Sequence, residues 1–75
     1  GRELSYGEKA VGLGFNPGGN PEVYACKAGF AAEIDRMHKL NMSTFDEEVM
    51  RMTRTAITNL QTAQMWAVKA ITWKS

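Results

Sequence analysis

The sequence predicts an all-α fold in which a short N-terminal helix precedes a long antiparallel helical hairpin. Apolar residues recur at steps of three and four between residues 21 and 40, which is the period of an amphipathic helix. Residues 45–73 contain no glycine and no proline, so nothing interrupts a second long helix. We expect a single domain over residues 1–75, because a chain of 75 residues has room for only one small core.

The N-terminal helix is expected at about residues 6–11. Ser5 and Glu8 have the spacing of a capping box, in which the serine hydroxyl and the glutamate carboxylate each accept a backbone N–H. Gly12 and Gly14 then end the helix. The loop of residues 12–20 is rich in glycine and proline, and we expect it to fold the short helix back onto the hairpin.

The second helix is expected at about residues 21–40. Asn20 serves as its cap and Pro21 takes the first helical position, where proline is favoured. We expect the helix to stop at Asn41, which tolerates a left-handed turn, and Ser43 or Thr44 to cap the next helix, with Thr44 and Glu47 at the spacing of a second capping box. The predicted apolar stripe of the second helix consists of Val23, Cys26, Phe30, Ile34 and Met37.

The third helix, at about residues 45–73, carries more apolar surface than one partner helix can cover. One row consists of Met50, Ile57 and Ile71. The other consists of Val49, Ala56, Ala63 and Ala70, with Met52, Leu60, Trp66 and Ala67 beside them. A second copy of the chain is expected to cover the surplus, because so small a chain is marginally stable alone and its single cysteine rules out an internal disulfide.

Composition argues against several classes of function. The net charge of +1 is too balanced for a general DNA-binding protein, and no apolar run is long enough to span a membrane. One cysteine and one histidine, Cys26 and His38, do not make a zinc site. A free cysteine without a visible signal peptide favours the cytoplasm.

No constellation of side chains predicts catalysis, so we expect a protein that is not an enzyme and has no cofactor, metal or catalytic residue. Cys26 is interpreted as a small buried hydrophobe of the apolar stripe. His38 is interpreted as a solvated residue near the C-terminal end of its helix. The Gly/Pro loop lacks the preceding strand and the Gly-Lys-Ser/Thr sequence of the known phosphate-binding loops.

Polar and charged residues offer binding chemistry instead. The polar run of the third helix fits either a wet interface between copies or hydrogen bonds to a ligand held between them. Its members are Thr55, Thr58, Gln61, Thr62 and Gln64. Arg51 and Arg54 are three residues apart, so both can face one way, and guanidinium groups suit phosphate. Around a symmetry axis, one arginine per copy would form a converging ring.

Aromatic and cationic residues also flank the Gly/Pro loop, where they could stack on bases and pair with phosphates. The aromatic residues are Tyr6, Phe15 and Tyr24, and the cations are Lys9 and Lys27. We expect Phe15 to fill the small core. Tyr6, in a mostly polar first turn, is expected to be exposed or to contact a partner.

Two blocks of sequence resemble one family. They are "YGEKAVGLGFNPGGNPEV" at Tyr6–Val23 and "AITNLQTAQMWAVKAITW" at Ala56–Trp73. Both resemble the phage anti-CBASS proteins of the second type, whose hairpin domain is shared with phage antagonists of the Thoeris defence. The resemblance implies a hexameric sponge in the cytoplasm of the infected bacterium. Such a sponge binds cyclic dinucleotides such as cGAMP, and cyclic trinucleotides at separate sites, without degrading them.

The resemblance also implies ligand-binding residues. For the dinucleotide they are Tyr6 with the adjacent Gly7, and a lysine that is either Lys9 or Lys27. For the trinucleotide, Arg51 and Arg54 are the candidates for a ring of arginines. The alternative is a structural helical module that docks onto another protein and holds no small ligand.

Overall fold

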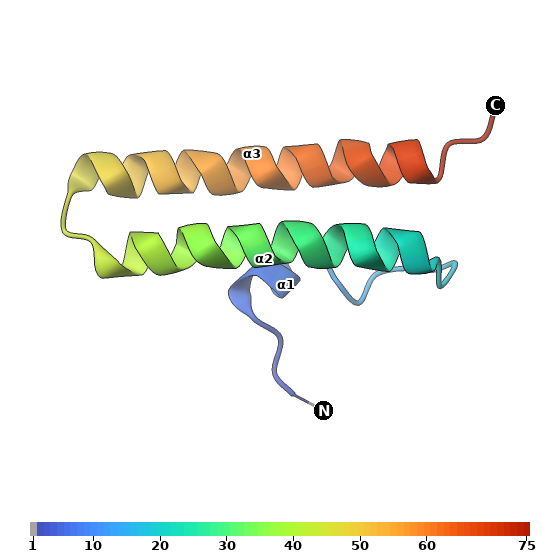
Figure 1. The fold of residues 1–75 in the computed structure, drawn as a ribbon, viewed down its shortest axis with the longest axis horizontal. Helices are drawn as coiled ribbons and strands as arrows, with labels where there is room; N and C mark the ends of the chain where they lie inside the picture. Colours follow the sequence, from blue (N-terminus) through green and yellow to red (C-terminus); the bar gives the residue numbers. More distant parts are fainter. Residues whose placement is uncertain (1) are drawn as a thin grey trace.

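The computed structural model describes residues 2–75 and contains three helices, α1 (Tyr6–Ala10), α2 (Pro21–Ser43) and α3 (Glu47–Ile71). Helices α2 and α3 lie antiparallel and side by side, and α1 packs against α2, while its last residue, Ala10, also accepts a hydrogen bond from Gln61 of α3 (Figure 1). Within residues 2–75 there is no strand, which confirms the predicted all-α hairpin. None of the described helices combines the length and apolar character needed to cross a membrane.

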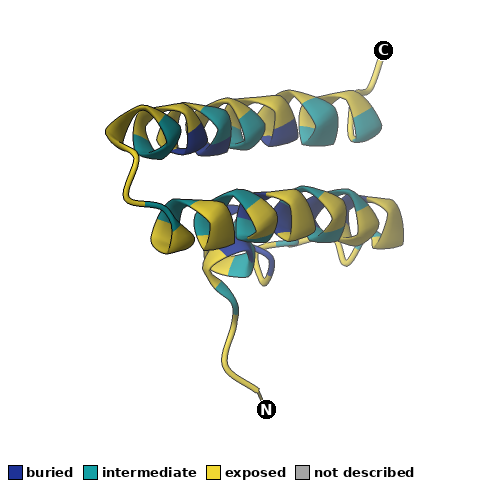
Figure 2. Cartoon of the chain, turned by 60° about the vertical axis from the view of Figure 1, so that its left-hand side comes forward, coloured by how far each residue is buried: buried dark blue, intermediate teal, exposed yellow. Residues whose placement is uncertain are grey.

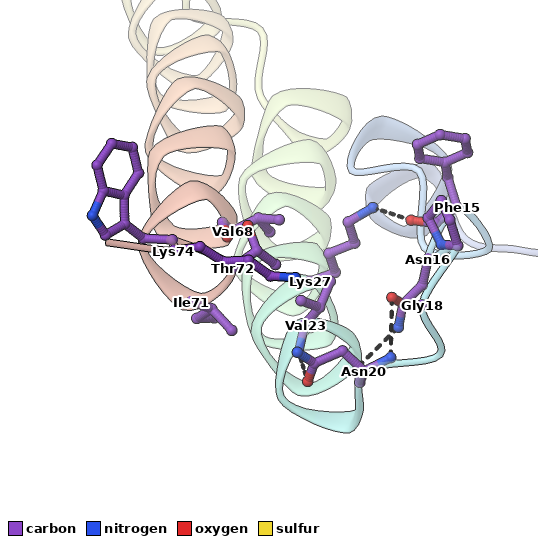
Figure 3. A pocket seen from close by; sticks show the side chains of 12 residues that line it. Phe15, Asn16, Gly18, Asn20, Val23, Lys27, Val68, Ile71, Thr72 and Lys74 are labelled. Atoms are coloured by element: carbon purple, nitrogen blue, oxygen red, sulfur yellow. Dashed lines mark hydrogen bonds between the residues drawn. The ribbon is translucent and has the colours of Figure 1, made fainter.

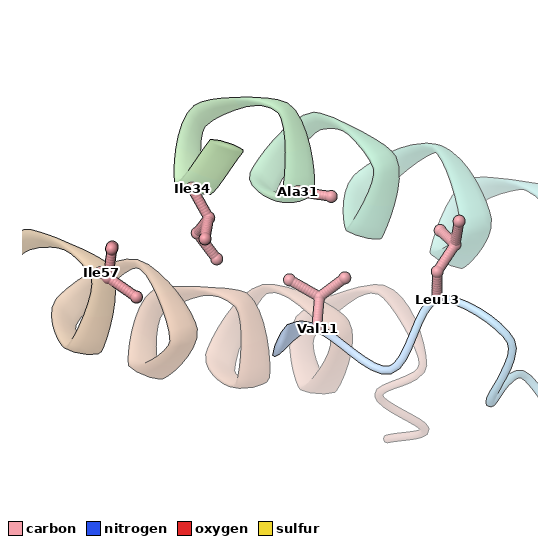
Figure 4. Close-up of a cluster of buried hydrophobic side chains, with 5 residues drawn as sticks. All are labelled: Val11, Leu13, Ala31, Ile34 and Ile57. Carbon is pink, nitrogen blue, oxygen red and sulfur yellow. The ribbon is translucent and has the colours of Figure 1, made fainter. Parts of the chain in front are cut away.

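The hydrophobic core lies where α1, the start of the Gly/Pro loop and the two long helices meet (Figure 4). Its buried members are Val11, Leu13, Ala31, Ile34 and Ile57. Only Ile34 among the larger side chains is fully buried. The molecule measures 46 × 33 × 12 Å, so it is a thin plate whose small core is close to solvent on both faces.

Helix α1 begins with the predicted capping box. The Ser5 hydroxyl accepts from the Glu8 N–H at 3.1 Å, and the Glu8 carboxylate accepts from the Ser5 N–H at 2.9 Å. The helix ends at Ala10, one residue before the predicted end. Val11 is its C-terminal cap, and Gly12 follows with φ of 62°, a left-handed conformation that suits glycine.

Helix α2 begins as predicted, because the Asn20 side chain accepts from the N–H groups of Glu22 and Val23. The predicted stop at Asn41 is wrong, since the helix continues to Ser43. Asn41 remains helical because its side-chain amide has partners on α3. It donates to the Met50 carbonyl at 3.2 Å and to the Thr53 hydroxyl at 2.9 Å.

Helix α3 begins later than predicted, and the capping box of Thr44 and Glu47 is wrong. The cap is Asp46, whose carboxylate accepts from the N–H groups of Glu48 and Val49. The Thr44 hydroxyl accepts instead from the Asp46 N–H at 3.1 Å, which shapes the turn before the helix. Aspartate is among the residues preferred at the cap of a helix, and Asp46 takes that position.

The two apolar rows of α3 have different surroundings (Figure 2). Ile57 of the first row is buried, and Met50 and Ile71 are half-buried. The second row is only partly covered: Val49, Ala56, Leu60 and Ala67 are half-buried, whereas Met52, Ala63, Trp66 and Ala70 are exposed. Part of the predicted surplus of apolar surface therefore remains uncovered in the single chain.

Several expectations for the core are wrong. Phe15 is 73% exposed, and Leu13 occupies the core in its place. Lys27, which lies off the predicted stripe, is buried, while Cys26 is only half-buried. Two members of the polar run of α3 make contacts within the single chain. Gln64 is buried, and Gln61 donates to the Ala10 carbonyl at 3.2 Å.

Candidate ligand-binding sites

A cavity of about 480 Å³ opens where the Gly/Pro loop and the start of α2 meet the end of α3 (Figure 3). The loop is folded by its own polar groups. The Asn16 amide donates to the Asn20 carbonyl at 2.8 Å, and the Gly19 N–H donates to the Asn16 carbonyl at 2.9 Å. Gly19 has φ of 61°, so this tight turn requires the freedom of glycine. The turn holds Phe15 at the rim of the cavity.

Lys27 reaches from α2 to the inside of the loop, as Figure 3 shows. Its ammonium donates to the Gly12 carbonyl at 3.1 Å and to the Phe15 carbonyl, and it lies 5.6 Å from the centre of the Phe15 ring. Lys27 is only 6% exposed, and these contacts use two of the three donors of its ammonium. Lys27 therefore both closes the loop and brings positive charge to the cavity wall.

The cavity has the chemistry for an anion that carries aromatic bases. Phe15 and Trp73 both line it, and both are largely exposed, at 73% and 66%. Lys74 also lines it and adds a second cation to that of Lys27. Stacking on exposed aromatic rings and pairing with ammonium groups are the two contacts by which proteins hold single-stranded nucleotides.

Tyr6 lies on α1, away from this cavity. Its ring stacks on His38 of α2, with centroids 4.0 Å apart and planes within 4° of parallel. His38 is eleven residues beyond Lys27, which corresponds to about 16 Å along the helix. Within one chain, Tyr6 and Lys27 therefore do not meet. The interpretation of His38 as a solvated residue at the helix end is also wrong, because α2 continues past it and Tyr6 covers it.

Asp35 anchors α1 to α2. Its carboxylate accepts from the Ser5 hydroxyl at 2.7 Å and from the Gly7 N–H at 2.6 Å. Gly7 is buried so close to α2 that an added Cβ would lie 2.1 Å from the Ala31 carbonyl oxygen. Gly7 thus has a packing role in this chain. Lys9, on the same helix, is exposed, and its side chain forms no hydrogen bond or ion pair with residues 2–75.

The N-terminal cap carries its own electrostatic network. Both Glu8 carboxylate oxygens accept from the Arg2 guanidinium, at 2.7 and 2.6 Å, and one also accepts from the Ser5 N–H. Because all these donors favour the ionised form, with Arg2 contributing most, the pKa of Glu8 falls from 4.5 to about 2. The cap is therefore fully charged near neutral pH.

Arg51 and Arg54 lie on the exposed surface of α3, far from the cavity. Arg51 donates to the Glu48 carboxylate at 2.6 and 3.0 Å, in an ion pair that is open to solvent. Arg54 has no such pair within the described chain. Arg54 precedes Val68 of the cavity wall by fourteen residues, or about 21 Å along the helix. Any site at these arginines is therefore separate from the cavity.

Comparison with known proteins identifies the family. The family model described as "Acb2/Tad1, hairpin domain" matches residues 8–72, which is most of the chain. The chain belongs to the Acb2/Tad1 hairpin family. This confirms the resemblance carried by the two sequence blocks. No curated protein and no solved structure matches the chain.

The cavity of this Acb2/Tad1 hairpin is lined in part by residues that the sequence did not indicate, Trp73 and Lys74. Trp73 and Lys74 reach the Gly/Pro loop only because the antiparallel pairing brings the end of α3 back beside the start of α2. The stacking of Tyr6 on His38 likewise depends on how α1 packs against α2. An alternation of exposed aromatic and basic residues at both ends of the hairpin is the one signal that could have indicated Trp73 and Lys74.

The Acb2/Tad1 hairpin has donors for binding an anion but no cluster suited to a metal. Across residues 2–75, no three side chains of histidine, cysteine, aspartate or glutamate lie close enough to share an ion. The cavity wall presents two ammonium groups, two aromatic rings, and the side chains of Asn16 and Asn20. Such a set can support one side of a ligand and neutralise its charge.

Proposed function

We propose that this chain is a non-enzymatic phage sponge that sequesters cyclic di- and trinucleotide messengers and so blocks CBASS immunity. In this proposal it works as a homohexamer in the cytoplasm of the infected bacterium. The observation that carries the proposal is the family match over residues 8–72. The cavity supports it, because its cations and exposed aromatic rings suit a nucleotide anion.

The geometry favours the cavity as the dinucleotide site. A cyclic dinucleotide carries two phosphates and two bases, and the cavity offers Lys27 and Lys74 for the phosphates and Phe15 and Trp73 for the bases. Its volume of about 480 Å³ is within the usual range of small-molecule pockets. We therefore assign the pocket lysine to Lys27. In this arrangement Tyr6 and Lys9 reach the ligand only from a neighbouring copy.

Arg51 and Arg54 remain the proposed trinucleotide residues. Both are exposed on one helix, and Arg54 is free of the ion pair that engages Arg51. A cyclic trinucleotide has three phosphates, so arginines from several copies around a symmetry axis would match its charge. The distance from the cavity is consistent with two classes of ligand at separate sites.

The direct test is a release experiment. The protein is incubated with cGAMP, separated from free ligand, and denatured by heat, and the released nucleotide is analysed by mass. We expect intact cGAMP in the supernatant. Linear product would show an enzyme, and the absence of uptake would overturn the proposal.

Substitutions locate the two sites. Phe15→Ala should weaken cGAMP binding about 5- to 150-fold, since stacking contributes about 1–3 kcal/mol per base, and it should leave the fold intact because Phe15 is exposed. Arg54→Ala should spare cGAMP and weaken a cyclic trinucleotide. Tyr6→Ala should also weaken cGAMP binding, because Tyr6 reaches the ligand from a neighbouring copy. Calorimetric titration measures all three, and an unchanged affinity of Phe15→Ala would reject the cavity.

One observation favours the second candidate, a helical module that docks onto another protein. Met65 and Trp66 are adjacent on α3 and are 61% and 66% exposed. Thermal unfolding against a panel of cyclic nucleotides separates the candidates, because a bound ligand raises the melting temperature with its concentration. A flat response across the panel would favour the docking module.

A further inference from the structure

Tyr6 is an exposed residue whose ring is nonetheless held in place by a stacking contact. The ring lies flat on that of His38, with centroids 4.0 Å apart and planes within 4° of parallel. Tyr6 is 47% exposed, whereas His38 is half-buried. A flat ring has two faces, so the stack covers one face of Tyr6 and leaves its exposed area on the other face and on the ring edges.

The backbone around Tyr6 is held by the same helix, α2. Asp35 precedes His38 by three residues, which is nearly one helical turn. Its carboxylate accepts from the Ser5 hydroxyl at 2.7 Å and from the Gly7 N–H at 2.6 Å, so it holds the residues on both sides of Tyr6. Asp35 therefore fixes the backbone of Tyr6, and His38 fixes the plane of its ring.

The docking of α1 has other supports besides this stack. Gly7 packs closely against the Ala31 carbonyl, and Val11, which caps the helix, is buried in the core. The main effect left for the contact with His38 is therefore the orientation of the Tyr6 side chain. Without that contact, a tyrosine on the open side of a short helix would exchange among rotamers.

Fixing a side chain before a ligand arrives raises affinity. A ligand that stacks on a freely rotating tyrosine must immobilise the ring at an entropic cost, and this cost is avoided when the ring already lies in one plane. Lys9 is exposed and three residues further along α1, so the open ring and an ammonium group lie on the same side of the helix. The ring suits a base and the ammonium suits a phosphate.

We propose that His38 is a positioning residue for Tyr6. It holds the ring so that the open face of Tyr6 receives a base of the cyclic dinucleotide that a neighbouring copy binds. In this arrangement His38 does not touch the ligand, because the Tyr6 ring lies between them. The inference rests on the proposed function, and it adds the residue on which the orientation of Tyr6 depends.

The stack is tested first without a ligand. Protons above the face of an aromatic ring resonate upfield of their usual position, so the ring protons of Tyr6 report the stack in a nuclear magnetic resonance spectrum. We expect shifted Tyr6 resonances in the unsubstituted chain and in His38→Phe, which keeps a flat ring. His38→Ala should return them to their usual position. Unshifted resonances in the unsubstituted chain would overturn the proposal at this step.

Three substitutions at His38 then separate the effect of a flat ring from that of bulk. His38→Ala removes the support, His38→Leu fills the space with a side chain that is not flat, and His38→Phe restores a flat ring. In calorimetric titration the first two should weaken cGAMP binding about 2- to 12-fold, the effect of freeing one side chain, and His38→Phe should bind as tightly as the unsubstituted chain. Circular dichroism checks that all three keep their helices. If His38→Leu binds as tightly as His38→Phe, bulk alone is sufficient and the proposal is overturned.

A double substitution shows whether His38 acts through Tyr6. In a Tyr6→Ala background, His38→Ala should cause no further loss of cGAMP affinity, because no ring is left to hold. An equal loss in both backgrounds would mean that His38 acts independently of Tyr6, which contradicts the proposal. If the unsubstituted chain takes up no cGAMP, the proposed function fails and this inference fails with it. If the chain binds cGAMP and all three His38 variants bind equally tightly, the inference alone is overturned.

Discussion

Gly7 lets α1 dock by lacking a side chain. Gly7→Ala would place a methyl group 2.1 Å from the Ala31 carbonyl oxygen, so the helices must separate and the Asp35 contacts weaken. We expect a loss of about 1–3 kcal/mol in the free energy of unfolding, as for other overpacked sites. Urea denaturation measures it. Gly14→Ala is the matched control, because a Cβ there meets nothing within 4 Å, and an equal loss in both variants would contradict this explanation.

Glu8 makes the N-terminal cap sensitive to acid. Its pKa is about 2 in the folded chain, below its ordinary value of 4.5, so its stabilising contribution is complete above pH 4.5 and is lost as the pH falls towards 2. Glu8→Gln should remove this dependence. Thermal unfolding from pH 7 to pH 2 should show the melting temperatures of the two proteins converging in acid. A constant difference across that range would count against the assigned pKa.

Signals that act within a few residues could be read from the sequence. The capping box of Ser5 and Glu8 and the cap at Asn20 were predicted correctly, because each bond joins neighbours in the chain. Phe15 and Lys27 could not be placed, since the exposure of one and the burial of the other depend on the path of the loop around an ammonium group. Local chemistry predicted the caps of α1 and α2, but neither the Asp46 cap of α3 nor the cavity.

At the scale of elements, the Asn41 side chain fixes how the two long helices meet. It bridges to the Met50 carbonyl and the buried Thr53 hydroxyl. Asn41→Ala leaves the Thr53 hydroxyl without that partner and should cost about 1–3 kcal/mol in the free energy of unfolding. Asn59→Ala, at an exposed position of α3, should change stability far less. Similar losses in chemical denaturation would show that the bridge contributes little.

The hairpin as a pair of elements was predictable, and its register was not. Helical periodicity and the lack of glycine and proline after residue 45 predicted two long helices. The extra turn of α2 and the later start of α3 determine which residues face each other. Helix α2 continues because the Asn41 side chain bonds to α3, and α3 starts later because Asp46 rather than Thr44 caps it. The placement of Trp73 and Lys74 at the cavity depends on that register.

At the scale of the whole molecule, apolar residues remain exposed on α3 and at the turn of the hairpin. Phe45 is 99% exposed, and Met65 and Trp66 are each more than half exposed. Of these three, only Trp66 belongs to the two rows of α3 from which the sequence predicted a surplus, and Phe45 and Met65 lie outside those rows. The pattern of one helix shows that apolar surface is left over. It does not show which copy or partner covers each patch, because that depends on the assembly.

The thinness of the plate has a consequence for how such a protein would take up a messenger. A body 12 Å thick can support one side of a nucleotide but cannot surround it, so full enclosure needs a neighbouring copy. Uptake then obeys mass action in protein as well as in ligand. We expect the apparent Kd for cGAMP to rise when the protein is diluted below the concentration at which its assembly dissociates. Equilibrium dialysis over a dilution series would show this, whereas a constant Kd would mean that each plate captures its ligand alone.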